Sequence, residues 1–254
     1  MRVITYNILN GGEGRADPLA EVIEAQRADV VVLVEADNQD VIERIAGRLK
    51  MDYITGPGGR HAGAILSRFT IRTTINHALL GEVPINSFLE AHVVDPAGVE
   101  WPIVAIHLKA RASEEREQIR ERQIEMILKR LKRLHGRPHI LAGDFNANSP
   151  IQQIDIAKCK PRTQEEFKEN GGVIPRRAIQ RLLDAGYTDT LFAAAPESAR
   201  TLGTSDTQHP GQRIDYIFTH GFAASKIKAA WIETDRLAKY ASDHFPIGAD
   251  IESA

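Results

Sequence analysis

Short apolar runs alternate along the chain with longer segments of helical periodicity. Val30 to Val34 is an unbroken aliphatic run rich in β-branched residues, which predicts a buried strand. The segment from Asp40 to Leu49 predicts a helix whose apolar stripe consists of Val41, Ile42, Ile45 and Leu49. This alternation of short strands with helices favours a layered α/β protein over an all-β sandwich or a helical bundle.

The same reasoning predicts the remaining elements. A helix is expected to begin with Asp17 as its N-cap and Pro18 at its first helical position. Another is expected to begin at Ser113, because acidic residues fill its first turns and basic residues its last. Further strands are expected at 3–6, 64–66, 91–94, 103–106 and 140–142, and a further helix at 176–185. The turn sequence 95–98 predicts a hairpin, and 158–172 and 201–212 are expected to be loops.

Composition narrows the class of protein. The 254 residues are 43% hydrophobic, which is enough for one large core, and we expect a single domain over residues 1–254. Lys and Arg total 32 against 34 Asp and Glu, so binding to nucleic acid through overall charge is not favoured. The single cysteine, Cys159, excludes an intramolecular disulfide. With neither a signal peptide nor an apolar run long enough to span a membrane, the protein is expected to be cytoplasmic. The sequence gives no indication of the oligomeric state.

Acidic, amide and imidazole side chains follow the apolar runs. Glu35 comes directly after the run ending at Val34, and His107 directly after the predicted strand 103–106. Asp144 and Asn146 follow 140–142, and an Asp-His pair at 243–244 precedes Phe-Pro-Ile. Strands that end together place such residues around one rim, where they can converge on a ligand.

These residues belong to blocks that resemble the endonuclease/exonuclease/phosphatase superfamily. The blocks occur in the family's order from residue 4 to residue 247, and Gly-Asp-Phe-Asn followed by Arg-Ile-Asp-Tyr and Ser-Asp-His-x-Pro is the most specific combination. They are Thr5-Tyr6-Asn7-Ile8, Val34-Glu35, Ala64-Ile65-Leu66-Ser67-Arg68, Ile106-His107-Leu108, Gly143-Asp144-Phe145-Asn146, Arg213-Ile214-Asp215-Tyr216-Ile217-Phe218 and Ser242-Asp243-His244-Phe245-Pro246. The resemblance implies a four-layer α/β/β/α sandwich, in which two packed mixed sheets are flanked by helices.

The resemblance also implies the metal site. Hydrolysis of a phosphate ester needs a hard cation, a group that activates water, and donors that meet charge on the phosphoryl oxygens. By similarity Glu35 is the principal ligand of Mg²⁺ or Mn²⁺, with Asn7 beside it, and Asp243 contributes directly or through water. Hard cations prefer such oxygen ligands.

The remaining roles follow from the same resemblance. His244 is expected to lie against the phosphate and to pair with Asp215, while Asp144 orients or deprotonates the attacking water; either Asp144 or His244 can be the base. Asn146 is expected to donate a hydrogen bond to a phosphoryl oxygen. His107 matches a second histidine of DNase-like members, which serves as a phosphate ligand or general acid, and Glu90 is the candidate to hold it.

The leading hypothesis is a metal-dependent phosphoesterase acting on a small or lipid-derived substrate, and the alternative is a DNA or RNA nuclease with the same chemistry. Two departures weaken an abasic-site repair assignment: Leu9 stands where those endonucleases carry an acid, and His107 replaces a tyrosine. A catalytically inactive binding module would be expected to have lost part of the site. This sequence keeps all of the expected site residues, which argues against an inactive module. They are Glu35, Asp144, Asn146, Asp215, Asp243 and His244.

Overall fold

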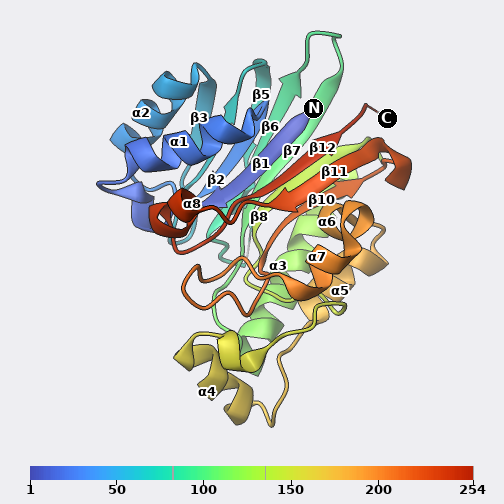
Figure 1. The fold of residues 1–254 in the computed structure, drawn as a ribbon. Coiled ribbons are helices and arrows are strands. Elements are labelled where there is room, and N and C mark those ends of the chain that lie inside the picture. Colours follow the sequence, from blue (N-terminus) through green and yellow to red (C-terminus); the bar gives the residue numbers. More distant parts are fainter. Residues whose placement is uncertain (82, 135, 254) are drawn as a thin grey trace.

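The computed structural model describes residues 1–81, 83–134 and 136–253, and within them twelve strands form two mixed sheets (Figure 1). The first sheet has the strand order β11 (Ile227–Ile232), β12 (Ile247–Ile251), β1 (Arg2–Asn7), β2 (Val30–Val34), β4 (Gly63–Ser67) and β3 (Asp52–Gly56). The second sheet has the order β5 (Thr70–Asn76), β6 (Ser87–Val94), β7 (Glu100–His107), β8 (His139–Asp144), β10 (Asp215–His220) and β9 (Thr188–Asp189).

Alternation along the strands divides the hydrophobic residues into three buried layers. In β2, Val30 and Val32 face the second sheet, whereas Val31 and Leu33 face the helices that cover the first sheet. Those helices are α1 (Ala16–Gln26), α2 (Gln39–Leu49) and α8 (Arg236–Ala241). The outer face of the second sheet packs against α3 (Glu114–Leu131) and α5 (Arg177–Asp184). The expected four-layer α/β/β/α sandwich is therefore confirmed.

Most predicted elements are confirmed, including the β6–β7 hairpin across the turn at 95–98 and the helix that begins after Ser113. The first helix begins earlier than predicted: its N-cap is Arg15, so Asp17 and Pro18 lie inside its first turn. Two short helices, α6 (Thr190–Ala194) and α7 (Pro196–Thr201), close one end of the layer between the sheets. None of the helices in the described part of the chain is both long and apolar enough to cross a bilayer.

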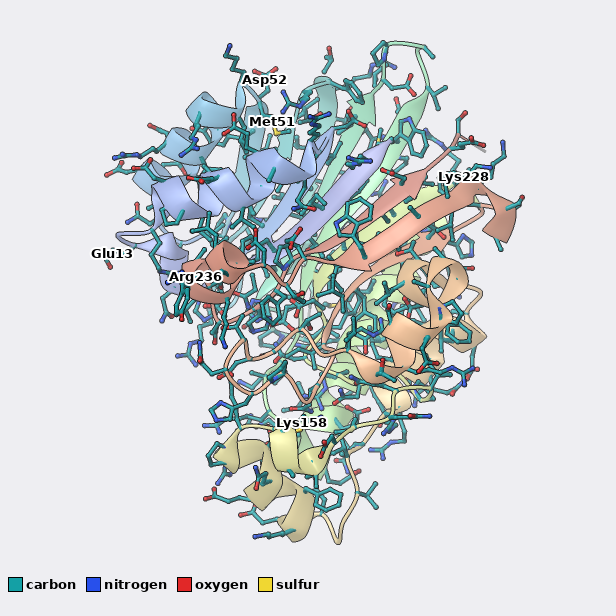
Figure 2. All side chains as sticks on the ribbon, viewed as in Figure 1. Glu13, Met51, Asp52, Lys158, Lys228 and Arg236 are labelled. Carbon is teal, nitrogen blue, oxygen red and sulfur yellow. The ribbon has the colours of Figure 1, made fainter. Side chains whose placement is uncertain are left out.

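The segment 158–172 is not the loop that its composition predicts. It contains α4 (Pro161–Glu169), which begins with proline at its first position. Its polar sequence is explained by its position, because α4 projects from the end of the sandwich opposite the two chain termini (Figure 1). Figure 2 shows Lys158 on the side of this projection that faces the sheets. The helix thus stands over the strand ends where the candidate site lies.

A buried network of charged groups occupies the helix-covered side of the second sheet. Glu90 is fully buried and bonds to His77 at 2.8 Å, to His92 at 2.6 Å and to Arg133. Burial alone would raise the pKa of Glu90, but these partners outweigh it and hold the pKa well below its ordinary value. Hydrogen bonds to Glu90 and Glu100 raise the pKa of His92 despite its burial.

We expect Glu90→Gln to lower the free energy of unfolding by about 3–5 kcal/mol at pH 7, because removing one member of a buried ionic network leaves its partners unpaired. Since the pKa of Glu90 is lowered on folding, its contribution is present above the ordinary value of 4.5 and is lost as pH falls below it. Denaturant unfolding at pH 7 and at acidic pH measures this difference. A Gln variant as stable as wild type at pH 7 would contradict the assignment.

Candidate active site

The first sheet supplies the metal side of the candidate site. β1 and β2 run parallel with Asn7 opposite Val34, so Glu35 emerges beside Asn7. The Asn7 amide donates to Glu35 Oε1 at 3.1 Å, and the Asn10 backbone N–H donates to Oε2 at 2.8 Å. Glu35 itself has a left-handed backbone conformation, with φ of 56°. Its carboxylate is therefore fixed in place at the point where the strand turns.

The second sheet supplies three more predicted residues. His107 ends β7 opposite Asp144, which ends the parallel strand β8. Asp144 in turn lies opposite Asp215, the first residue of the antiparallel strand β10. The Asn146 backbone N–H donates to Asp144 Oδ1 at 2.8 Å, and its side chain donates to the Leu108 carbonyl at 3.2 Å. These pairings bring the ends of three neighbouring strands to one rim.

Asn7 joins the two halves of the site. Its side-chain nitrogen lies 3.2 Å from Asp144 Oδ2 as well as 3.1 Å from Glu35, while its oxygen accepts from the Leu9 backbone N–H at 3.0 Å. In this orientation the amide nitrogen faces the carboxylates. Asn7 therefore positions Glu35 and Asp144 here, and ligation of a metal through its oxygen would require the amide to turn and to release Leu9.

The expected pairing of His244 with Asp215 is present. His244 Nδ1 lies 2.8 Å from Asp215 Oδ2, and both side chains are buried. Burial alone would lower the pKa of His244, but Asp215, Asp144 and Asp243 outweigh it and raise the pKa to about 10. The surrounding carboxylates therefore favour the charged form of His244.

Asp144 has the opposite shift. Its burial and the nearby Asp215 carboxylate raise its pKa to about 7, although the charge of His244 works against them. A carboxyl group with this pKa can accept a proton near neutral pH.

His107 lies in the site, but the predicted pairing with Glu90 is wrong. In the hairpin Ser87 stands opposite His107, so Glu90 is three residues further along β6 and points to the other face of the sheet. His107 Nε2 instead lies 3.7 Å from Asp144 Oδ2. Burial, followed by the charges of His61 and His244, lowers the pKa of His107 to about 3. His107 is therefore neutral.

A second histidine–carboxylate pair beside the site was not predicted from the sequence. His61 Nδ1 lies 2.7 Å from Asp37 Oδ2, and the His61 ring stacks on His107 with a centroid distance of 5.6 Å. Asp37 follows β2 and His61 precedes β4, which are paired strands. Both residues lie close in sequence to the ends of predicted strands, and this position is the feature of the sequence from which they could have been found.

The converging residues line a cavity of about 280 Å³. Its walls include one predicted group at the strand ends and one group from the segments 110–112, 160–166 and 205–214. The lining residues are Glu35, His107, Asp144, Asn146, Asp243 and His244 in the first group and Ala110, Arg111, Ala112, Lys160, Arg162, Thr163, Glu166, Ser205, Gln212 and Ile214 in the second. The cavity is therefore bounded by strand ends on one side and by α4 on the other.

Four arginines, Arg111, Arg162, Arg176 and Arg177, could form one basic face if they all lined this cavity. Arg111 and Arg162 line it. Arg176 instead donates to backbone carbonyls of residues 149, 150 and 152, and Arg177 pairs with Glu114 and Glu121. The arginines do not form a continuous basic face.

The donors in the cavity suit a hard cation. Glu35, Asp144 and Asp243 present carboxylate oxygens, and within the described ranges nothing donates a hydrogen bond to the buried Asp243 Oδ1. Asp144, Asp215 and His244 also offer ligand atoms within 4.8 Å of one another, but the last two are already paired. Burial and, after it, the nearby Asp215 carboxylate raise the pKa of Asp144, and a divalent cation would favour its charged form. The residues present therefore fit Mg²⁺ or Mn²⁺.

The four-layer sandwich, with acids and histidines gathered where its two sheets end together, defines the DNase I-like class of proteins. A family model matches residues 4–244, and the chain belongs to the endonuclease/exonuclease/phosphatase family. This membership supports a hydrolase or nuclease that acts on phosphoesters.

Solved structures share the fold at low sequence identity. The 3′ phosphatase NExo from Neisseria, bound to a product DNA hairpin, is 22% identical with a TM-score of 0.75, and all of both chains is covered. An AP endonuclease from Archaeoglobus fulgidus is 19% identical with a TM-score of 0.73, again over all of both chains. A humanized D. rerio TDP2 is 18% identical with a TM-score of 0.71, covering all of this chain and 99% of the other. Comparison with curated proteins finds no match.

Proposed function

We propose that the protein is a Mg²⁺- or Mn²⁺-dependent phosphoesterase that uses water to cleave an ester of a compact substrate. The observation that carries this proposal is that one cavity of about 280 Å³ is lined by Glu35, Asp144 and Asp243 together with His244, which Asp215 contacts at 2.8 Å and favours in its charged form. Such a cavity admits a small phosphoester. Its acidic end suits the cation, and the charged histidine suits the phosphoryl oxygens.

Glu35 is the principal metal ligand in this proposal, with Asp243 contributing directly or through water and Asn7 beside them. When bound, the cation neutralises charge on the phosphoryl and leaving oxygens. Two hydrogen bonds hold the Glu35 carboxylate before any metal arrives. The protein thus presents an ordered ligand instead of ordering one on binding.

Asp144 and His244 have different roles in this proposal. Asp144 accepts the proton of the attacking water, and Asn7 and the Asn146 backbone N–H orient its two oxygens. His244, held as a cation by Asp215, donates from Nε2 to a phosphoryl oxygen. Asn146 retains an amide hydrogen for a second oxygen, and neutral His107 can donate from Nε2. These donors meet the negative charge that grows in the transition state.

We expect Glu35→Gln to raise the Mg²⁺ concentration needed for half-maximal activity by about tenfold or more, because a neutral amide is a weaker ligand of a hard cation than a carboxylate. Activity across a Mg²⁺ titration measures this shift, and the unfolding midpoint provides the check on folding. Chelation should abolish turnover in both proteins, and added Mg²⁺ or Mn²⁺ should restore it. Full activity in excess EDTA would refute the metal requirement.

The activity of a nuclease is expected to depend on salt concentration more steeply than that of an enzyme for a small phosphoester. A nuclease that neutralises several phosphates releases counterions and loses affinity steeply as salt increases. A pocket that reads one phosphoester depends weakly on salt. We expect higher kcat/KM on bis-p-nitrophenyl phosphate than on a DNA duplex, with a shallow salt slope. Faster cleavage of DNA with a steep slope would favour the nuclease instead.

A further inference from the structure

The cavity has two ends of opposite charge. The acidic end, at the strand termini, holds the carboxylates of Glu35, Asp144 and Asp243, and its opposite wall carries three cationic side chains. These are Arg111, Lys160 and Arg162, which come from the loop after β7 and from the start of α4. We call these three residues the basic wall. A cation and a phosphoester occupy the acidic end in the proposed function, which leaves the basic wall without a partner in the reaction.

A buried carboxylate organises this wall. The Glu166 side chain is only 3% exposed, and it accepts from the Ala112 backbone N–H at 2.7 Å and from Arg162 Nε at 3.2 Å. Arg111 Nη1 lies 4.0 Å from the same carboxylate. Glu166 therefore ties α4 to the loop that carries Arg111 and keeps both guanidinium groups at the cavity.

The loop that carries Arg111 is held in place by a side chain of α3. Arg120 is buried and pairs with the buried Glu117 at 2.7 Å. Its guanidinium also donates to the backbone carbonyls of Lys109 and Arg111. These bonds fix the backbone of the loop that carries Arg111 before a ligand binds.

Lys160 connects the two ends of the cavity. Its Nζ lies 3.4 Å from Asp243 at the acidic end and 3.4 Å from Asp206. Lys160 is the residue before the first turn of α4, and Arg162 and Thr163 of that turn also line the cavity. The positive end of the helix adds to the charge of the side chains there.

Lys160 is engaged by Asp206 and Asp243, so the positive charge open to a ligand is that of Arg111 and Arg162. Arg162 also approaches Glu165 at 3.2 Å and Glu169 at 3.9 Å, but these carboxylates are 60% and 59% exposed. Exposed pairs of this kind are weak and exchange readily for a better ligand. Among the cavity residues, Glu166 is the only acid at the basic wall, and it faces two arginines.

We propose that the basic wall binds a second phosphate, so that the preferred substrate is a compact molecule carrying one phosphate besides the ester that is cleaved. This inference rests on the proposed phosphoesterase activity and specifies its substrate class. Arginine suits this ligand because its planar fork can donate two hydrogen bonds to one phosphate. The second phosphate would dock on the basic wall while the ester lies at the acidic end.

Two substrates that differ only in the second phosphate test this proposal. One is the p-nitrophenyl ester of thymidine 3′-phosphate, and the other carries an additional 5′-phosphate. Their scissile bond and leaving group are the same, so the ratio of their kcat/KM values reports the second phosphate alone. We expect wild type to prefer the bisphosphate by about tenfold or more, as for a hydrogen bond to a charged group.

Arg111→Gln and Arg162→Gln should each bring this ratio towards one. Arg181→Gln is the matched control, because Arg181 pairs with Glu121 and Glu125 and does not line the cavity. It should keep the wild-type ratio. A ratio close to one in wild type, or a ratio unchanged in both cavity variants, would overturn the proposal.

A hexathymidylate strand identifies the source of the second phosphate. If the strand is cleaved with higher kcat/KM than the bisphosphate, the basic wall serves a nucleic acid and the compact substrate is excluded. If neither p-nitrophenyl ester is cleaved by the metal-loaded protein, the proposed function fails and the second-phosphate site fails with it. Cleavage of both esters at equal rates rejects the second-phosphate site while leaving the phosphoesterase activity established.

Discussion

His244→Ala and Asp215→Asn are each expected to lower kcat on the order of 10²-fold or more, with a double mutant little worse than the poorer single mutant. The reason is the 2.8 Å contact through which Asp215 keeps His244 charged and oriented. Without its carboxylate the buried histidine loses its proton, and without the histidine the carboxylate has no catalytic partner. Steady-state kinetics of the four proteins at saturating Mg²⁺ measures the coupling.

Independent groups would give multiplied losses, on the order of 10⁴-fold in the double mutant. That outcome would show that Asp215 and His244 do not act as a unit. Unfolding curves are needed for all four proteins, since both side chains are buried. Losses that follow the fraction unfolded would point to stability as the cause.

Asp144→Asn is expected to lower kcat by about 10²–10⁴-fold, the usual range for removal of a general base. It should also abolish the acidic limb of the pH profile. In wild type, activity should increase with pH as Asp144 loses its proton, because only the carboxylate can accept one from water. Burial and Asp215 place this limb above the usual range of an aspartate.

Raising the Mg²⁺ concentration should move that limb to lower pH, since a nearby cation favours the carboxylate form. Asp52→Asn is the control for loss of one negative charge, because Asp52 is exposed on β3 and does not line the cavity. It should keep both rate and profile. An unchanged acidic limb in Asp144→Asn would exclude Asp144 as the base.

The site residues at the strand ends could be predicted from the sequence, because the hydrophobic runs show where the strands lie and which residues follow them. Glu35 and Asp144 each follow a run that is buried on both faces, and such runs are strands of an inner sheet position. Residues directly after such runs then lie where the strands of the sheet end. The structure confirms that these ends meet.

The misplaced Glu90 shows what periodicity does not contain. Its face and its distance from His107 depend on which residues of β6 and β7 stand opposite each other, and a shift of one residue would have reversed its direction. The position of the basic wall could not be predicted from the sequence for a related reason. Arg162 and Glu166 are four residues apart on α4, but the contacts of Glu166 with Arg111 and with the Ala112 backbone N–H join segments far apart in sequence, which no local pattern records.

The site is divided between two sheets that touch each other mainly through side chains. Asn7 and Glu35 belong to the first sheet, and Asp144 and Asp215 to the second. The separation between the Glu35 and Asp144 carboxylates therefore depends on the thickness of the aliphatic layer between the sheets, in which Val32 packs. A substitution that changes the volume of a side chain in that layer would therefore alter this separation, and with it the rate, although it lies far from every reacting atom.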